Sequence, residues 1–588
     1  MIRSSKTNLD IIELSKINAN PVFLGKQKIK LALLADCASQ HLANILKNLF
    51  LINGIALVLY ESDYNTIEAN AYDAGSNLYS FNPDYIVIFN SVQALRERYY
   101  LSENNKERFV NQEAEKIQNI WSVLRGRLNA SIIQTNFATP HERLYGNQDV
   151  IFPQSLRYSV LSLNQKIAAD AALQKNVFIQ DINYTASYAG TKNWLDEKMW
   201  VLYKIPCALN LLPYVAQSIV ETTLSLQGAI IKCIVLDLDN TLWGGMIGED
   251  GLEGIRLGHY EDGESYQLFQ KYLLELKKRG VLLTVCSKND ADKALLPFRS
   301  HPEMILKETD ITLFVANWEN KAKNLKDIKE ILKIGYDSMV FLDDSSFERA
   351  LIRECLPNVI VPELPEDPAE FVKTLSELNL FEITSISFTD ASRTQIYREE
   401  FERKRTEKEF SHHNDYLKSL SMKISISKFT PLELPRIIQL MQRSNQFNLM
   451  TRRFNEAECK HFMGHTADYL PLYIKLSDKY GDSGLISTVV LKLESPDILI
   501  EEWVMSCRVL ARGVEYCVMN YILDYAKKNN FHRLIGKYRS TEKNAMVSDF
   551  YKQFGFIRNP ATAEGVVSWS LEVDAYLPKE MFFKEVCE

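Results

Sequence analysis

The sequence predicts an α/β protein with doubly wound parallel sheets, followed by a smaller region of α+β type. Short apolar runs alternate with longer helix-like segments through much of the 588 residues. This alternation is typical of parallel sheets covered by helices on both faces. Near the C-terminus apolar runs follow one another directly, which indicates meandering strands. Since a domain averages roughly 150 residues, we expect three or four domains rather than one core.

The composition narrows the class of protein. With 46% hydrophobic and 24% charged residues, the chain has the balance of a soluble globular protein. Its formal charge of −7 gives no general attraction to nucleic acid or an anionic membrane. The N-terminal residues resemble no secretory signal, and the most apolar stretch, residues 45–60, is interrupted by polar residues. Nine scattered cysteines do not suggest a disulfide framework, so we expect a reduced, cytoplasmic protein.

The pattern of elements predicts four regions. Residues 1–226 alternate between strands and helices, with helices expected over Gln40–Ile52 and Glu107–Leu128 and strands within 30–37, 55–62, 84–91, 130–137 and 176–183. Residues 227–380 alternate again, with helices over Glu264–Arg279 and Lys321–Lys333 and strands within 231–236, 281–287, 313–317 and 338–344. Residues 381–420 form a charged helical connector. Residues 421–588 begin with a helix over Pro431–Arg443, continue through strands within 470–479, 484–493 and 498–507, and end in a strand–helix alternation.

Two carboxylates follow the first strand of the second region. Asp237 and Asp239 come directly after a run of apolar residues, with Leu238 between them. Ligands of parallel α/β sheets collect at the carboxyl ends of the strands, and alternation directs both aspartates to the same side. Such a pair would repel unless a cation lies nearby, and carboxylate oxygens suit Mg²⁺.

Three further motifs supply groups to the same edge. Asp343 and Asp344 end a later strand, Ser287 ends another with a hydroxyl that can hold a phosphate oxygen, and Lys321 begins a helix. The motifs occur in the order of a phosphoryl-transfer site of the haloacid dehalogenase (HAD) type.

That order predicts a role for each group. Asp237 would attack phosphorus to form an aspartyl-phosphate, and Asp239 would protonate the leaving oxygen and later activate water. Mg²⁺ and Lys321 would neutralise charge on the phosphoryl group. The candidate metal ligands are Asp237, Asp239, Asp343 and Asp344. Between the last two we favour Asp343, which ends the apolar strand, and Asp344 is the alternative.

Longer strings extend this similarity. The segments DLDNTLWGGMIGEDGLEGIRLG, VCSKND, NWENKA, FLDDSSFER and VPELPEDP resemble the FkbH-like proteins of the HAD family. The first region, with RLYGNQD and LYKIP, and the last region, residues 421–588, also resemble the long form of that family, so the similarity spans nearly the whole chain. The resemblance implies a HAD-type parallel sheet in the centre, flanked by an SGNH- or flavodoxin-like α/β domain and a GNAT-like α+β domain.

The resemblance also implies an activity. FkbH-like proteins are associated with polyketide-type biosynthesis, where they convert 1,3-bisphosphoglycerate to a glyceryl thioester on an acyl carrier protein. We therefore expect a phosphatase and glyceryltransferase that uses Mg²⁺, a phosphorylated small molecule and an acyl carrier protein. The alternatives are a phosphatase for another phosphorylated small molecule, or an acyltransferase or carrier-docking protein acting through the GNAT-like domain.

Two cysteines are candidates to hold an acyl group. Cys286 precedes Ser287 at the mouth of the expected site, although alternation can equally turn it into the sheet packing. Cys37 lies at a strand-to-helix turn, where a helix N-terminus could depress its pKa. In SGNH-like domains a serine follows Gly-Asp at this turn, and here Ala35-Asp36-Cys37 takes that place. Asn90 falls where such enzymes keep an oxyanion asparagine.

The last region, residues 421–588, resembles a GNAT acyltransferase. Its cofactor loop would run from Arg508 through Arg512 and Gly513 to a helix over Val514–Lys528, whose N-terminal N–H groups could bind pyrophosphate. Ala511 replaces the first glycine of the usual pattern. Asn544, Tyr551 and Gly555-Phe556 match the end of the pattern. Because coenzyme A and carrier proteins share a pantetheine arm, this domain could dock the carrier instead.

Overall fold

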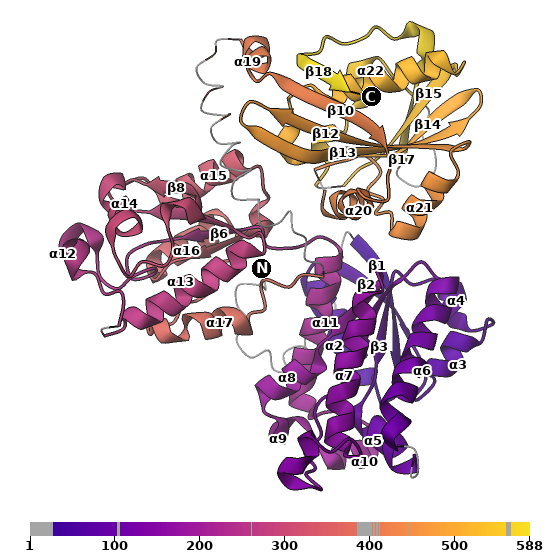
Figure 1. The fold of residues 1–588 in the computed structure, drawn as a ribbon, viewed down its shortest axis with the longest axis vertical. Helices are drawn as coiled ribbons and strands as arrows, with labels where there is room; N and C mark the ends of the chain where they lie inside the picture. The colour runs from indigo at the N-terminus through magenta and orange to yellow at the C-terminus, as the bar shows by residue number, and fades with distance from the viewer. Residues whose placement is uncertain are drawn as a thin grey trace. The chain divides into compact units, whose positions relative to one another are not determined.

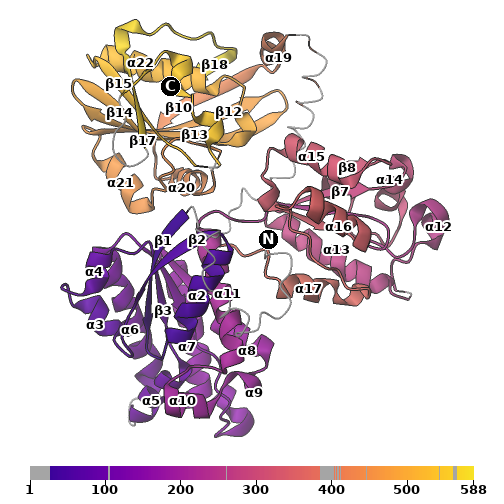
Figure 2. The same ribbon diagram turned by 180° about the vertical axis from the view of Figure 1, so that it is seen from behind.

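The structure is a computed structural model that describes residues 27–102, 106–259, 261–384, 403, 406, 410, 412–444, 446–541, 543–559 and 566–587. The described residues form three β-sheets (Figures 1 and 2). The chain divides into two compact units, residues 1–226 with 376–384, and residues 227–375 with 385–588. The first unit holds one sheet and the second holds the other two.

The sheet of the first unit is parallel, with strand order β2-β1-β3-β4-β5. Its strands are β1 (Gln27–Ala35), β2 (Ile55–Glu61), β3 (Tyr85–Phe89), β4 (Ser131–Thr135) and β5 (Val177–Gln180). Its helices are α2 (Gln40–Ile52), α3 (Ile67–Tyr72), α4 (Asn77–Phe81), α5 (Val92–Leu101), α6 (Lys106–Arg127), α7 (Leu156–Ala172), α8 (Ile182–Ala189), α9 (Thr191–Trp194), α10 (Glu197–Tyr203) and α11 (Leu212–Leu226). Helices α2 and α11 pack together, and α3 packs against α6 on the opposite side of the sheet (Figure 1). The order reverses at β1 and β3, a point where α/β sheets commonly bind ligands.

The central sheet has four parallel strands in the order β8-β7-β6-β9. They are β6 (Cys233–Leu236), β7 (Leu282–Ser287), β8 (Ile311–Ala316) and β9 (Met339–Leu342). The accompanying helices are α12 (Ile247–Gly254), α13 (Gly263–Lys278), α14 (Ala291–Ser300), α15 (Lys321–Leu332), α16 (Ser346–Cys355) and α17 (Phe371–Glu377). Strand β6 lies between β7 and β9, so residues that follow these three strands meet at one edge.

Helix α15 forms because its sequence fits both its start and its buried face. The side chain of Asn320 accepts a hydrogen bond from the N–H of Ala322 at 2.7 Å, which caps the helix. Leu325, Ile328 and Leu332 then pack against the sheet in a core shared with Val235 and Phe341. This packing fixes the first residue of the helix, Lys321, over the carboxyl ends of the strands.

The third sheet is mixed, with the path β16-β17-β15-β14-β13-β12-β10-β18 and β11 paired to β14. Its strands are β10 (Met422–Lys428), β11 (Phe447–Asn448), β12 (Tyr469–Asp478), β13 (Gly481–Glu494), β14 (Asp497–Met505), β15 (Arg533–Arg539), β16 (Ile557–Arg558), β17 (Val566–Glu572) and β18 (Phe583–Cys587). Its helices are α19 (His413–Ser419), α20 (Leu434–Arg443), α21 (Glu456–Gly464) and α22 (Val514–Lys528). A sheet of this α+β kind is the one expected for a GNAT-like domain.

The predicted α/β character is confirmed. Helices α2 and α22 have the predicted bounds, and α13, α15 and α20 differ from prediction by one residue or a few at their ends. Most of the predicted connector lies outside the described residues. Cys37 and Cys286 are free thiols, and the part of the chain that the structure describes contains no disulfide bond. In the same residues no helix is long and apolar enough to cross a membrane.

A substitution of Leu325 tests how much the core beneath the site contributes to stability. Its side chain is fully buried, so Leu325→Ala removes apolar contacts and leaves a cavity, at a cost of about 2–5 kcal/mol in the free energy of unfolding. Leu268→Ala, at a position 52% exposed on α13, is the matched control and should cost less than about 1 kcal/mol. Urea unfolding followed by tryptophan fluorescence measures both, and equal losses in the two variants would contradict this packing.

Candidate functional site

Two carboxylates and a hydroxyl meet at the carboxyl edge of the central sheet. Asp237 follows β6, Ser287 ends β7 and Asp343 follows β9. The N–H of Asp237 donates to the carbonyl oxygen of Leu342 at 2.9 Å, which extends the pairing of β6 and β9 as far as the site. The sheet therefore brings together groups that are more than a hundred residues apart in the sequence.

Lys321 lies between these two carboxylates. Its Nζ is 3.0 Å from Oδ1 of Asp237 and 2.7 Å from Oδ2 of Asp343. The side chain of Lys321 is 3% exposed and that of Asp343 is fully buried. Burial acts to lower the pKa of Lys321, but the charges of Asp237 and Asp343 outweigh it and raise that pKa. Burial and the charge of Asp237 raise the pKa of Asp343 to about 7, although Lys321 opposes them.

The loop after β9 is held in place by backbone contacts. The N–H of Ser345 donates to Oδ1 of Asp343 at 2.9 Å, and Arg349 donates to the carbonyl oxygens of Asp343 and Asp344 at 2.8 and 2.6 Å. Arg349 is itself paired with Glu363. The loop thus keeps Asp343 inside and leaves Asp344 exposed.

Asp237, Asp343 and Asp344 form a candidate metal centre. One carboxylate oxygen from each lies within 4.8 Å of the other two. Three carboxylates are hard oxygen ligands of the kind that Mg²⁺ prefers, and the exposed side of Asp344 leaves room for water or substrate. The residues therefore fit the expected Mg²⁺. Asp343 and Asp344 both offer an oxygen to this candidate centre, so the preference for Asp343 over Asp344 stays a prediction.

The side chain of Asp239 is engaged elsewhere. Its Oδ1 accepts hydrogen bonds from Nε1 of Trp243 at 2.9 Å and the N–H of Ile247 at 3.0 Å. Its Oδ2 accepts from Nδ2 of Asn289 at 2.8 Å. Asp239 is thus not among the three carboxylates of the candidate metal centre, and three donors fix its oxygens. Its roles as a metal ligand and as a general acid and base stay predictions. Trp243 and Asn289 were not predicted, although both lie within the DLDNTLW and VCSKND strings.

Adjacent residues of β7 have different surroundings. Ser287 is buried beside the site, and its Oγ accepts a hydrogen bond from Nδ2 of Asn289 at 3.4 Å. Its role in phosphate binding stays a prediction. Cys286 packs into the core formed with Leu325 and Phe341, and its Sγ is 4.0 Å from the carbonyl oxygen of Lys321. Burial raises the pKa of Cys286 to about 12. The geometry thus favours the packing alternative over an acyl-carrying role for Cys286.

Cys37 is also buried. It follows β1, and burial, followed by the charge of Asp36, raises its pKa well above the ordinary value. The expected lowering by a helix N-terminus is therefore wrong. Both ends of the Asn90 amide are occupied, since Nδ2 donates to Asp36 at 3.2 Å and Oδ1 accepts from Gln134 at 2.8 Å. At this turn the Cys37 thiol is buried, and the Asn90 amide is held by Asp36 and Gln134.

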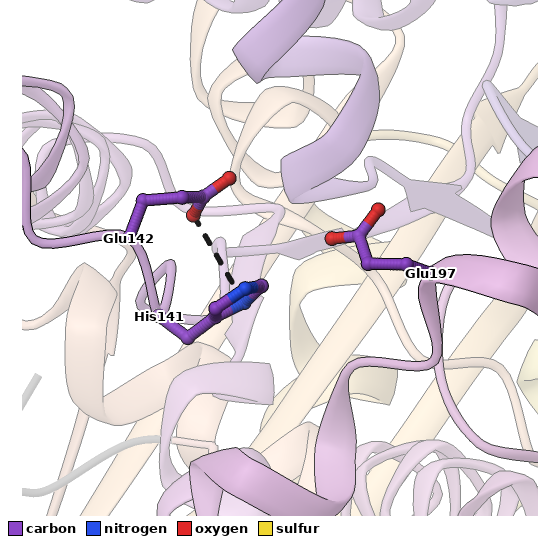
Figure 3. Close-up of side chains that lie close together, drawn as sticks. All are labelled: His141, Glu142 and Glu197. Carbon is purple, nitrogen blue, oxygen red and sulfur yellow. Dashed lines mark ion pairs between the residues drawn. The ribbon is translucent and has the colours of Figure 1, made fainter.

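A second group of potential metal ligands lies in the first unit. His141, Glu142 and Glu197 have ligand atoms within 4.8 Å of one another, and the imidazole and both carboxylates converge (Figure 3). Arg96 already pairs with both carboxylates, because it contacts Glu142 at 2.5 Å and Glu197 through two nitrogens at 2.9 and 3.0 Å. We therefore interpret this group as an ion-pair network that fastens the loop after β4 to the start of α10.

The predicted cofactor loop lies between β14 and α22. The backbone of Arg508 belongs to a 3₁₀ turn over Cys507–Val509, and its side chain is outside the described atoms. Gly513 adopts the left-handed conformation before α22, with φ of 74°. Arg512 is 5% exposed and its guanidinium lies 3.3 Å from Oδ2 of Asp478. Arg512 is thus directed into the domain.

Comparisons with known proteins agree with this description. The sequence model of the FkbH N-terminal domain matches residues 30–223. A crystal structure of the N-terminal part of the protein BF1531 from Bacteroides fragilis, which contains a phosphatase domain complexed with Mg, is 36% identical. The match covers 64% of this chain and 100% of that chain, with a TM-score of 0.61.

Other matches cover only about a quarter of the chain. The ribosomal-protein-S18-alanine N-acetyltransferase of Escherichia coli is 14% identical, with coverage of 26% of this chain and 94% of that chain and a TM-score of 0.21. The PaiA N-acetyltransferase of Thermoplasma acidophilum, in complex with coenzyme A, is 14% identical, with coverage of 26% and 99% and a TM-score of 0.20. At these values the matches carry no conclusion about activity. No curated protein matches the chain.

Mg²⁺ should stabilise the central domain through the three carboxylates. A ligand that binds only the folded state raises the unfolding temperature, so we expect that temperature to rise with Mg²⁺ in thermal unfolding of the whole chain. Asp344→Asn removes one ligand charge. It should raise by about ten-fold or more the midpoint, the Mg²⁺ concentration that gives half of the maximal rise in unfolding temperature. Asp327→Asn, at an exposed position on α15, should leave the midpoint unchanged. An unchanged midpoint in Asp344→Asn would exclude Asp344 as a ligand.

Proposed function

Because this chain belongs to the FkbH-like family of phosphatase-domain proteins, we propose that its central site removes the phosphoryl group from a phosphorylated small molecule with the help of Mg²⁺. The observation that carries this proposal is the placement of Lys321 between Asp237 and Asp343, with Asp239 held separately. One carboxylate is available for the nucleophile and another for proton transfer. This division of roles is what phosphoryl transfer through an aspartyl-phosphate requires.

In the first step the carboxylate of Asp237 attacks phosphorus, and the bond from phosphorus to the leaving oxygen breaks. Lys321 stays within 3.0 Å of Asp237 and neutralises negative charge on the nucleophile and on the transferred group. Ser287 would hold an oxygen of the phosphoryl group. When bound, Mg²⁺ would add positive charge at Asp237, Asp343 and Asp344 and orient the phosphoryl group.

Asp239 completes the reaction. Its carboxyl group gives a proton to the leaving oxygen and then takes one from the water that hydrolyses the aspartyl-phosphate. The hydrogen bonds from Trp243 and Asn289 limit the orientations of this carboxyl group, so the proton is delivered from one direction. Hydrolysis releases free phosphate and regenerates the carboxylate of Asp237.

For the substrate we propose 1,3-bisphosphoglycerate, with an acyl carrier protein as acceptor. The resemblance of the whole chain to the FkbH-like proteins supports this choice. The acyl-phosphate carbon would form a bond to the sulfur of a thiol as its bond to the phosphate oxygen breaks, and the thiol proton would be lost. The 3-phosphate would then leave through the aspartyl-phosphate route, which yields a glyceryl thioester.

The thiol that attacks the acyl phosphate is best assigned to the carrier itself. Cys286 and Cys37 are both buried, and burial raises the pKa of each thiol, so neither presents a thiolate to a substrate. The pantetheine thiol of a carrier is mobile and exposed. We therefore favour direct transfer to the carrier, with Cys286 and Cys37 as the two alternatives on this chain.

The aspartyl-phosphate route makes Asp237 indispensable. Asp237→Asn replaces the nucleophile by an amide and should lower phosphate release by about 10³-fold or more, with an unchanged fold. Phosphate release from a small phosphomonoester, with and without EDTA, measures the effect, and circular dichroism checks the fold. The control Asp327→Asn should keep wild-type turnover. Near-wild-type turnover in Asp237→Asn, or full activity in EDTA, would exclude the mechanism.

The intact mass of the proteins tests the substrate and the thiol together. Incubation with 1,3-bisphosphoglycerate and a pantetheine-bearing carrier should add a glyceryl group to the carrier in the wild type, Cys286→Ala and Cys37→Ala. Loss of loading in only one cysteine variant would make that cysteine the acyl station. Absence of an adduct from wild-type enzyme that still releases phosphate from other esters would favour the plain phosphatase alternative.

A further inference from the structure

The C-terminal domain has a gap between two parallel strands. Strands β14 and β15 pair only from Asp497 with Arg533 to Ile500 with Gly536. Beyond that point the two strands are no longer paired with each other. A free strand edge of this kind can bind an extended chain that carries amide groups.

A coenzyme A molecule bound as a GNAT-like fold implies would use that edge. Its pyrophosphate would lie at the N-terminus of α22. The loop of residues 506–513 joins this terminus directly to the end of β14. The nearest edge for the amide-bearing pantetheine arm is therefore the unpaired part of β14.

The chain itself occupies this edge. In the segment of residues 447–452, which we term the inserted segment, Phe447 pairs with Met505 and Asn448 with Val504. The N–H of Leu449 donates to the carbonyl oxygen of Trp503 at 3.2 Å. On its other side, the carbonyl oxygen of Leu449 accepts from the N–H of Arg539 on β15 at 2.9 Å. The inserted segment thus bridges the two separated strands.

A buried carboxylate fixes the inserted segment. Glu502 is fully buried, and its two oxygens accept hydrogen bonds from the N–H groups of Met450 at 3.0 Å and Arg452 at 2.8 Å. Nδ2 of Asn544 adds a hydrogen bond to the carbonyl oxygen of Asn448 at 2.8 Å. Displacement of the segment would leave these buried groups without partners, which is costly.

The side chains of the inserted segment are part of the core. Phe447 is 3% exposed and Leu449 is fully buried. The ring of Phe447 packs edge-on against that of Phe550, with 5.1 Å between the ring centroids, and its centroid lies 6.2 Å from that of Trp503. The segment therefore behaves as a permanent strand of the sheet and not as a loop resting on it.

The loop before α22 is also poorly suited to bind the pyrophosphate of coenzyme A. Arg512 pairs with the fully buried Asp478, which also accepts two hydrogen bonds from Arg403 at 2.7 Å. Glu515 places a carboxylate in the first turn of α22, where it would repel phosphate. Ala511 has a positive φ of 64°, so a Cβ stands where close approach of a phosphate favours glycine.

We infer that the C-terminal domain does not bind acyl-coenzyme A, because its own inserted segment fills the position expected for pantetheine and Arg512 of its loop forms a buried structural ion pair with Asp478. This inference revises the predicted cofactor role of Arg512. It also removes the loop as the receiving site for a carrier's arm. The phosphatase proposed above does not depend on it.

Calorimetric titration of the full-length protein with coenzyme A and with acetyl-coenzyme A tests the inference. We expect no saturable heat with either ligand up to about 1 mM, where a site of micromolar affinity would be filled. Hydrogen exchange should show slow exchange at the amides of Leu449 and Arg539, unchanged by either ligand. Saturable binding of either molecule, or ligand-dependent exchange in the inserted segment, would overturn the inference.

An Arg512→Ala variant distinguishes a structural role of this residue from a role in cofactor binding. Arg512→Ala leaves Asp478 with one cationic partner fewer and should lower the unfolding temperature of the C-terminal domain by about 5 °C or more. Lys528→Ala, on the exposed side of the same helix and paired with Asp524, should change that temperature by less than about 2 °C. An Arg512→Ala variant of unchanged stability that loses measurable acetyl-coenzyme A binding would show that the loop is a cofactor site.

Discussion

The balance of charge around Lys321 is the constraint on which the central domain depends. Two carboxylates that are nearly excluded from water would repel each other strongly, and the ammonium group between them makes the arrangement stable. That ammonium is in place because Asn320 caps α15 and because the apolar face of the helix packs against the sheet. The position of Asp237, the nucleophile that we propose, therefore follows from the packing of α15 against the sheet, and the geometry of the site is tied to the integrity of its core.

The sequence predicted the strand-end groups well because period-two alternation and strand ends can be identified from local patterns. The order of Asp237, Ser287, Lys321 and Asp343 was enough to expect that they meet. The partners of Asp239 could not be found in this way. Trp243 and Asn289 reach it only through the turn after β6 and the edge of β7, and local patterns do not encode such contacts.

The two cysteines and the loop of the third sheet show a different limit of sequence reasoning. Alternation allowed either direction for Cys286, and only the packing around it selects the core. Cys37 is buried as well, which the residues of its own turn did not indicate. In the third sheet, the motif beginning at Arg508 resembles a cofactor loop in its letters. The partner that turns Arg512 inward, Asp478, lies 34 residues away and has no sequence signal.

The inserted segment has a consequence for the order in which the C-terminal sheet can form. Its hydrogen bonds reach β14 on one side and β15 on the other, and both strands come later in the chain. During synthesis the segment must wait until Arg539 has emerged before it can be secured on both edges. Until β15 is made, the part of β14 from Asp497 to Ile500 lacks its partner on that edge, and an unpaired strand edge is a recognised route to aggregation. A protein shortened before β15 would keep that edge open, so β15 protects a strand that precedes it in the chain.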